Sequence, residues 1–115
     1  MLDDIASSAL HRALSGLATR QRVIADNIAN IETPGYRANR VQFEAELRAA
    51  VDAGDPAHAD IGVAQSLEPT RLNGNNVNLD LETLSNVDTG LRYQLMLRAV
   101  DGKHSLLRTA ISGGA

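Results

Sequence analysis

The 115-residue chain has no cysteine, and only 3% of its residues are aromatic. Without cysteine it can form neither a disulfide nor a thiolate-bound metal site. Large rings usually dominate a small core, so a self-contained core would have to come from Leu, Ile, Val and Ala. Tyr36, Phe43 and Tyr93 are the whole aromatic set. The length allows one domain at most, with little material for a globular interior.

A strong charge of either sign is also missing, because the net charge is only −3. Residues 1–40 carry five arginines against four acids, residues 41–82 two arginines against eight acids, and residues 83–115 four bases against two acids. Mildly basic ends therefore flank an acidic middle, which in a polymer would favour contacts between the ends and middles of neighbours. No basic stripe of the kind that nucleic-acid binding needs is present.

Export, membrane and catalytic signals are equally scarce. No stretch approaches the roughly 20 apolar residues of a membrane span, and Asp3 and Asp4 stand where a signal peptide would carry positive charge. The histidines, His11, His58 and His104, have no second ligand at metal-binding spacing. The serine-nucleophile and phosphate-binding motifs are absent. Composition alone predicts a cytoplasmic protein, and we predict no catalysis, no cofactor and no metal.

What the chain does have is a long apolar periodicity near its start. A helix is predicted from Asp3 or Asp4 to Ile31, on the order of 40 Å long. Its apolar positions repeat with the 4-3 spacing of a coiled coil over three heptads. One polar residue in this row can set the register at a cost in stability. The predicted assembly seam of this helix is Leu10, Leu14, Leu17, Gln21, Ile24, Ile28 and Ile31.

The acidic middle segment, residues 37–77, is predicted to be partly irregular. Tyr36–Phe43 can be extended, and a short helix is expected over about residues 42–53. Short strands are expected at residues 60–64 and 68–72, and Asn73-Gly74 is a turn signal.

A second long helix is predicted from about residue 78 to residue 111, with Asn78 or Asp80 as its cap. Its apolar residues form two stripes, which predicts partners on two sides because one neighbouring helix needs only one stripe. The first stripe contains Leu84, Val87, Leu91, Leu95 and Leu106, which complete the predicted assembly seam; the second contains Tyr93, Met96, Val100, Leu107 and Ile111.

The predicted fold is mainly α, with long N-terminal and C-terminal helices packed as an antiparallel coiled-coil-like hairpin. It divides into residues 1–36, 37–77 and 78–115, which form one structural unit. These helices carry more apolar surface than they can bury against each other, so the chain is expected to be incomplete as a monomer. A closed homodimer and an open helical polymer both remain compatible with this pattern.

The stretch from Asp26 to Tyr36 is the most distinctive local motif. Pro34-Gly35 fits the central positions of a type II turn, in which the second position needs a positive φ. Asn27 and Asn30 are three residues apart and share a helix face. They can brace this turn through hydrogen bonds to the backbone, or bond between subunits of an assembly; turn and cap roles are also the default for the later asparagines.

The motif resembles the N-terminal signature of the axial proteins of the bacterial flagellum (rod, hook and related subunits). A second stretch, residues 74–82, together with Leu91-Arg92-Tyr93-Gln94, is similar to the proximal rod subunits of that family. The resemblance covers residues 8–43 and 74–111, and residues 44–73 contribute nothing to it. The residues that carry it are Asn27, Ala29, Asn30, Thr33, Pro34, Gly35, Tyr36, Gly74, Asn75, Asn76, Val77, Leu79 and Glu82.

The resemblance implies a structural subunit of the proximal rod of the flagellar basal body. Such a subunit would polymerise through its terminal helices into a torque-transmitting drive shaft with a central export channel. Its implied partners are other copies of itself, other rod proteins, the membrane-embedded basal ring with its adaptor, and the flagellar type III export apparatus. It would be exported without a cleaved signal peptide, and neither nucleic acid nor membrane insertion is implied. The alternative is a closed helical dimer acting as a soluble adaptor or chaperone-like binding module.

Overall fold

The computed structural model describes residues 2–111, without the side chains of residues 2, 3 and 107. Two long helices dominate it, α1 (Leu2–Ala29) and α3 (Leu79–Ile111). The shorter elements between them are β1 (Asn39–Gln42), α2 (Glu44–Asp52), the 3-10 turn η1 (Pro56–His58) and β2 (Gly62–Gln65). The predicted mainly α fold, with two long packed helices and a partly irregular middle, is confirmed.

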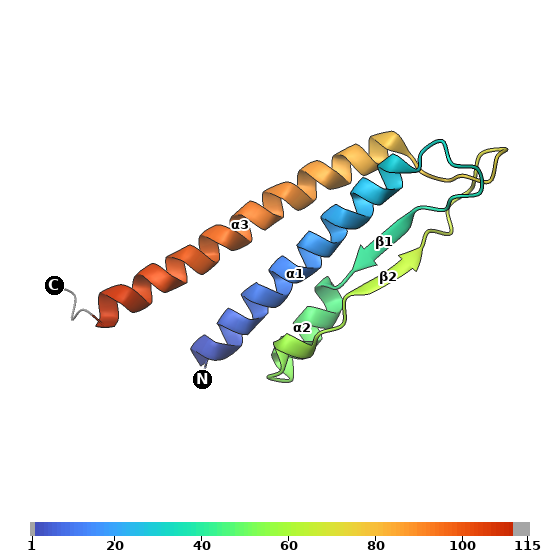
Figure 1. Ribbon diagram of the computed structural model, residues 1–115. Coiled ribbons are helices and arrows are strands. Elements are labelled where there is room, and N and C mark those ends of the chain that lie inside the picture. Colours follow the sequence, from blue (N-terminus) through green and yellow to red (C-terminus); the bar gives the residue numbers. More distant parts are fainter. Residues whose placement is uncertain (1, 112–115) are drawn as a thin grey trace.

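Helix α1 lies in the middle of the molecule (Figure 1). α3 runs antiparallel along one side of it. On the other side lie α2 and the β1–β2 pair, which we call the β-hairpin although α2 and η1 connect its two strands. The molecule extends 65 × 28 × 14 Å, and its radius of gyration of 17.9 Å exceeds the roughly 13 Å of a compact chain of this length. A body this thin leaves little volume far from solvent, so its apolar core is necessarily small.

The core lies midway along α1, where β1 and the start of α2 approach it. Leu17, Val41 and Phe43 are buried together. The ring of Phe43 occupies the space beside Gly16, and a Cβ built on that glycine would lie 2.6 Å from a ring carbon. Glycine is therefore needed at this point of α1 for the ring to approach the backbone. Partly buried side chains extend the cluster: Ala13, Val23, Leu47, Ile61, Tyr93 and Met96.

The two strands pair in antiparallel fashion, with Val41 opposite Val63 and Arg40 opposite Ala64. Val41 packs against Leu17 of α1. Because side chains alternate between the two faces of a strand, Arg40 and its partner Ala64 lie on the other face of the β1–β2 pair. The outer edge of β1 is covered by α1, since Arg20 donates to the carbonyl of Val41 at 2.8 Å. The hairpin is thus fixed to α1 by packing and by hydrogen bonds.

Helix α1 ends at Ala29, two residues before the predicted end at Ile31. The Ile31 N–H bonds to the carbonyl of Ile28 at 3.2 Å, and the Asn30 carbonyl accepts from the N–H of Thr33 at 3.0 Å. These are the tighter bonds of a terminal turn. Pro34 also disfavours helical geometry for the residue before it.

The predicted strand at residues 68–72 is wrong. The side-chain amide of Asn76 donates to the carbonyls of Ser66 at 3.3 Å and Glu68 at 3.1 Å, and Pro69 has no N–H to offer a ladder. The segment is therefore held as a loop. The other predicted strand, at residues 60–64, forms at Gly62–Gln65, so it begins two residues later and ends one residue later than predicted.

Helix α3 begins as expected. The Asn78 side-chain oxygen accepts from the N–H of Leu81 at 3.2 Å, which is an N-cap bond. The predicted stop of this helix at Ser112-Gly113-Gly114 lies outside the described residues. Among the helices of residues 2–111, none is both long enough and apolar enough to span a bilayer.

Candidate functional site

Five polar side chains meet at the end of the molecule where the long helices connect to the middle segment. We call this set, Asn27, Arg40, Asn75, Asn76 and Glu82, the polar junction. Asn27, Asn75 and Glu82 are 0% exposed, and Asn76 is also buried. Burying such groups without hydrogen bonds costs several kcal/mol, so their bonding decides whether this end is stable.

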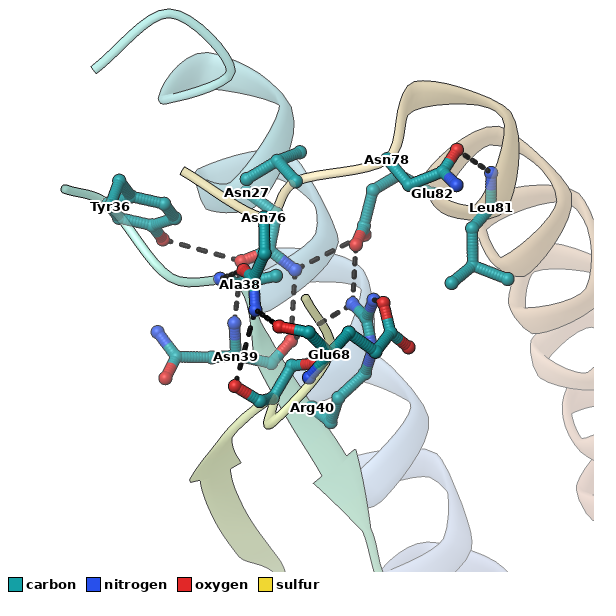
Figure 2. A network of polar contacts seen from close by, with 12 residues as sticks. Asn27, Tyr36, Ala38, Asn39, Arg40, Glu68, Asn76, Asn78, Leu81 and Glu82 are labelled. Carbon is teal, nitrogen blue, oxygen red and sulfur yellow. Dashed lines mark hydrogen bonds and ion pairs between the residues drawn. The ribbon is translucent and has the colours of Figure 1, made fainter. Parts of the chain in front are cut away.

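Asn27 uses its whole amide to join three elements (Figure 2). Its Nδ2 donates to the carbonyl of Asn39 at 2.9 Å and to Glu82 Oε2 at 3.2 Å. Its Oδ1 accepts from the Asn39 N–H at 2.9 Å and from the Tyr36 hydroxyl at 3.3 Å. An asparagine amide has two N–H donors and two acceptor lone pairs. Asn27 is therefore saturated within one chain, which leaves it no hydrogen bond for a neighbouring subunit.

Glu82 brings a fully buried carboxylate from the first turn of α3. Arg40 of β1 donates to its Oε1, and the Nη2 of the same guanidinium lies 3.6 Å from Glu68 Oε2. Removing either partner of a buried ion pair leaves an uncompensated charge and is strongly destabilising. This arrangement anchors the start of α3 to the β-hairpin across the end of α1.

Asn75 and Asn76 fix the loop before α3 to the turn after α1. Asn75 Nδ2 donates to the carbonyls of Asn30 at 2.8 Å and Thr33 at 2.9 Å. Asn76 Oδ1 accepts from the N–H of Ala38 at 2.7 Å. Asn75 braces the turn after α1 through backbone bonds, as its default interpretation predicted. Asn76 instead bonds to the backbone just before β1 and after β2.

The Pro34-Gly35 turn is confirmed as type II. Gly35 has φ of 75°, and the Tyr36 N–H bonds back to the carbonyl of Thr33 at 3.2 Å. Gly74, with φ of 83°, packs directly on this turn: a Cβ on it would lie 3.2 Å from the Cα of Gly35. Two glycine turns that are 39 positions apart in the sequence therefore meet backbone to backbone.

The family-motif residues divide between the junction and the molecular surface. Asn27, Asn75, Asn76, Val77 and Glu82 are buried, and Asn30, Tyr36 and Gly74 are partly buried. The exposed members are Ala29, Thr33, Pro34, Gly35 and Leu79. The motif thus covers both the interior and the surface of this turn region.

The predicted seam of α1 lies largely inside the subunit. Leu17 and Ile24 are only 3% and 4% exposed. The other five members are partly buried: Leu10, Leu14, Gln21, Ile28 and Ile31. Most of this row is therefore occupied by packing within the chain.

The seam residues of α3 are bare. Leu84, Val87, Leu91 and Leu95 are 68%, 56%, 64% and 60% exposed, and we call these four the leucine stripe. Leu106 continues the row at 76% exposure. The side of α3 that faces α1 contributes buried Glu82 and Thr89 and partly buried Tyr93, Met96 and Val100. At 100° per residue these two rows lie on nearly opposite sides of the helix.

Of the two predicted stripes on the second helix, the structure packs only one. Tyr93 and Met96 extend the core against α1, whereas the leucine stripe touches solvent along more than three helical turns. Ile111, assigned to the packed stripe, is 85% exposed, and the side chain of Leu107 lies outside the description. Exposed apolar patches of this kind mark interaction surfaces.

Sequence reasoning missed Arg40 and Thr89. Arg40 meets Glu82, a residue 42 positions away, and no local pattern links the two. Thr89 is fully buried, and its hydroxyl has no partner among the described residues. A polar residue between the apolar positions of the helix was the only available signal.

One further ion pair stabilises the hairpin side of α1. The Arg20 guanidinium donates to both carboxylate oxygens of Glu44, each at 2.7 Å, and its Cζ lies 5.0 Å from the centre of the Phe43 ring. The hydrogen bond from Arg20 lowers the pKa of Glu44 from 4.5 to about 2. No group of three or more potential metal ligands occurs among the residues that the structure describes.

Together, a pair of long antiparallel helices, a hydrogen-bonded turn region and an exposed apolar stripe define a structural subunit of a larger assembly. Comparison with known proteins shows which assembly. Residues 4–37 match the family model described as flagella basal body rod protein. The chain is 34% identical over 118 residues to flagellar basal body rod protein FlgB of Bacillus subtilis, covering 91% of this chain and 92% of that protein.

Two other relatives agree. The FlgB protein of Escherichia coli is 32% identical over 137 residues and covers 99% of each chain. That of Borreliella burgdorferi is 34% identical over 110 residues, with 75% of this chain and 80% of the relative covered. The chain belongs to the FlgB family of flagellar basal body rod proteins, a family of structural components of the basal body.

Proposed function

We propose that this rod protein assembles through the leucine stripe of α3, which packs against neighbouring rod subunits, and that the polar junction keeps each subunit rigid. The observation that carries the proposal is the exposure of four large aliphatic side chains on one face of α3, opposite the face that packs against α1. Fully burying such a side chain is worth about 1.5–3 kcal/mol. A neighbour that covers the stripe would therefore gain a substantial driving force.

The position of the stripe is compatible with the open polymer of a rod. The exposure of its residues places the stripe on the side of α3 that faces away from α1. The paired strands lie on the other side of α1 (Figure 1). A neighbour bound to the stripe leaves the opposite side of the subunit free for another contact, as a heterologous interface requires. The partly buried seam positions of α1, Leu10, Leu14 and Ile28, would contribute at the margins of this contact.

The more specific features of the proposal concern place and mechanics. The subunit would occupy the proximal rod, next to other rod proteins and the membrane-embedded ring with its adaptor. The terminal helices would form the inner layer around a central channel, and the chain would reach the rod through the flagellar export apparatus without a cleaved signal peptide. The polar junction supports a torque-bearing role, because it ties α1, β1 and α3 together with bonds that cannot be released one at a time without cost.

Sedimentation velocity with far-UV circular dichroism, over a concentration series of the purified chain alone and with added rod subunits, tests the mode of assembly. The proposal predicts sedimentation coefficients that keep rising with concentration or partner, with helix content constant or increasing. A dimer whose size and helicity do not change with concentration would contradict it and favour the closed adaptor.

A further inference from the structure

A groove of about 880 Å³ lies beside the β-hairpin. Its floor includes Gly62 and Ala64 of β2 and Gln42 of β1, the strand residues that point away from α1. Leu67 forms part of its wall and is 93% exposed. Because the floor residues are small, the groove has room for several side chains of a partner, and its volume lies within the range of about 300–1,000 Å³ that holds whole small ligands. The exposed Leu67 adds an apolar contact surface.

The groove is acidic. Four carboxylates line it, Glu44, Glu46, Asp60 and Glu68, whereas Arg40 is the one basic residue in the lining. Arg40 is already paired with buried Glu82. Glu46 and Asp60 are exposed, and neither forms an ion pair within the described chain. The groove therefore presents unneutralised negative charge beside an apolar surface.

The groove and the leucine stripe lie on opposite sides of the layered molecule. Val41 faces α1 and the groove floor faces the other way, while the stripe is on the far side of α3. If the stripe packs into the helical interior of the rod, the groove faces outward from it. Of the exposed bases, Arg98 and Arg108 belong to α3, the element that this assembly covers. Arg22, Arg37 and Arg48 are exposed elsewhere, so a second copy is distinguished from a different partner by the crosslinking test below.

We propose that the groove binds a segment of a different basal body protein that is rich in Arg or Lys and carries small or aliphatic side chains between them. Its bases would pair with Glu46 and Asp60, and its apolar side chains would rest on Gly62, Ala64 and Leu67. This inference relies on the proposed function only for the outward orientation of the groove. Charge complementarity of this kind supplies specificity and steers the partner into register.

Site-specific photo-crosslinking in flagellated cells, with each variant as the sole copy, tests the assignment. A photoreactive benzoylphenylalanine replaces Leu67 in the groove, Leu72 outside it, or Leu91 in the stripe. All three positions are strongly exposed, so the replacements spare the core. The expected product at Leu67 is an adduct with a Lys- or Arg-rich peptide of another protein, identified by sequencing the crosslinked peptide, with no such adduct at Leu72.

Charge reversal provides the matched control. Glu46→Lys with Asp60→Lys should lower the yield of the Leu67 adduct by about tenfold, which corresponds to two exposed ion pairs. Glu32→Lys with Asp52→Lys makes the same change of charge at exposed positions outside the groove and should leave the yield unchanged.

The other outcomes overturn specific parts of the account. A Leu67 adduct with a second copy of this chain, or with a segment lacking bases, would reject the proposed partner. Leu91 adducts with rod subunits in the absence of any Leu67 adduct would reject the groove as a docking site and leave the assembly proposal intact. The absence of any adduct between position 91 and a rod subunit would reject the assembly proposal itself.

Discussion

At the scale of single residues, the buried amides hold this molecule together. Asn27 and Asn75 connect segments that the chain separates by 12 to 55 positions. The sequence suggested that such residues brace a turn, and this much was predictable because asparagine favours local backbone bonds. Their burial and the ion pair of Glu82 with Arg40 were not predictable, since those partners come together only in the folded chain.

Replacing Asn27 with alanine should lower the free energy of unfolding by about 3 kcal/mol, because it leaves the backbone of Asn39 and Oε2 of Glu82 without their Asn27 partners in a buried site. Urea unfolding followed by circular dichroism measures the change. Asn30→Ala is the matched control and should cost less than about 1 kcal/mol, since its side-chain bonds are at an exposed turn. Equal losses for the two variants would refute the special role of Asn27.

Thr89 offers the opposite test, because its buried hydroxyl has no partner within the described structure. Thr89→Val keeps the shape of the side chain and removes the unsatisfied group, so we expect stabilisation of about 1 kcal/mol. Thr83→Val, at an exposed position of the same helix, should change stability by less than about 0.5 kcal/mol. Destabilisation by Thr89→Val in thermal unfolding would show that the hydroxyl forms a bond when the protein is folded.

At the scale of elements, Arg20 links α1 to both β1 and α2. It donates to the Val41 carbonyl and to Glu44, so one side chain of the long helix fixes the hairpin and the start of the short helix. Periodicity predicted the long helices well, because their 3.6-residue pattern extends over many turns. Periodicity predicted the strands and the loop of the middle segment less accurately, because four-residue strands and a loop held by asparagine side chains depend on partners far away in the sequence.

The Arg20–Glu44 pair should make stability depend on pH in the acid range. The pKa of Glu44 in the folded chain is about 2, below its ordinary value of 4.5. The stabilisation is therefore fully present above the ordinary pKa and is lost as the pH falls through about 2. Because the carboxylate is 47% exposed, the effect should stay below about 1 kcal/mol.

Unfolding by urea at a series of pH values from neutral to strongly acidic measures this contribution. Glu44→Gln should lower the free energy of unfolding at neutral pH. It should also make the free energy of unfolding fall less steeply as the pH is lowered. Glu46→Gln, two residues further along α2, is the control and should leave the profile close to that of the wild type. Parallel profiles for the wild type and Glu44→Gln would show that the ion pair contributes nothing.

At the scale of the whole molecule, the subunit has two different outer sides. One carries the leucine stripe, and the other carries the acidic groove. The excess of apolar surface was visible in the sequence as two stripes on one helix. The sequence did not show which of the two stripes stays exposed, because both have helical spacing and only the packing of Tyr93 and Met96 against α1 decides it.

The seam residue Leu17 is buried in the folded subunit. A charged substitution at this position would therefore unfold the subunit and not merely block its assembly.

The central claim, assembly through the leucine stripe, is tested most directly by the amount of a stripe variant that is recovered in isolated basal bodies. Leu91→Lys with Leu95→Lys keeps good helix formers in α3 and should leave the monomer's free energy of unfolding within about 0.5 kcal/mol of the wild type. We predict at least a roughly tenfold loss of the variant from basal bodies and loss of motility. Thr83→Lys with Asn86→Lys, exposed on α3 outside the stripe, should be incorporated normally. Wild-type incorporation and motility of the stripe variant would contradict the account.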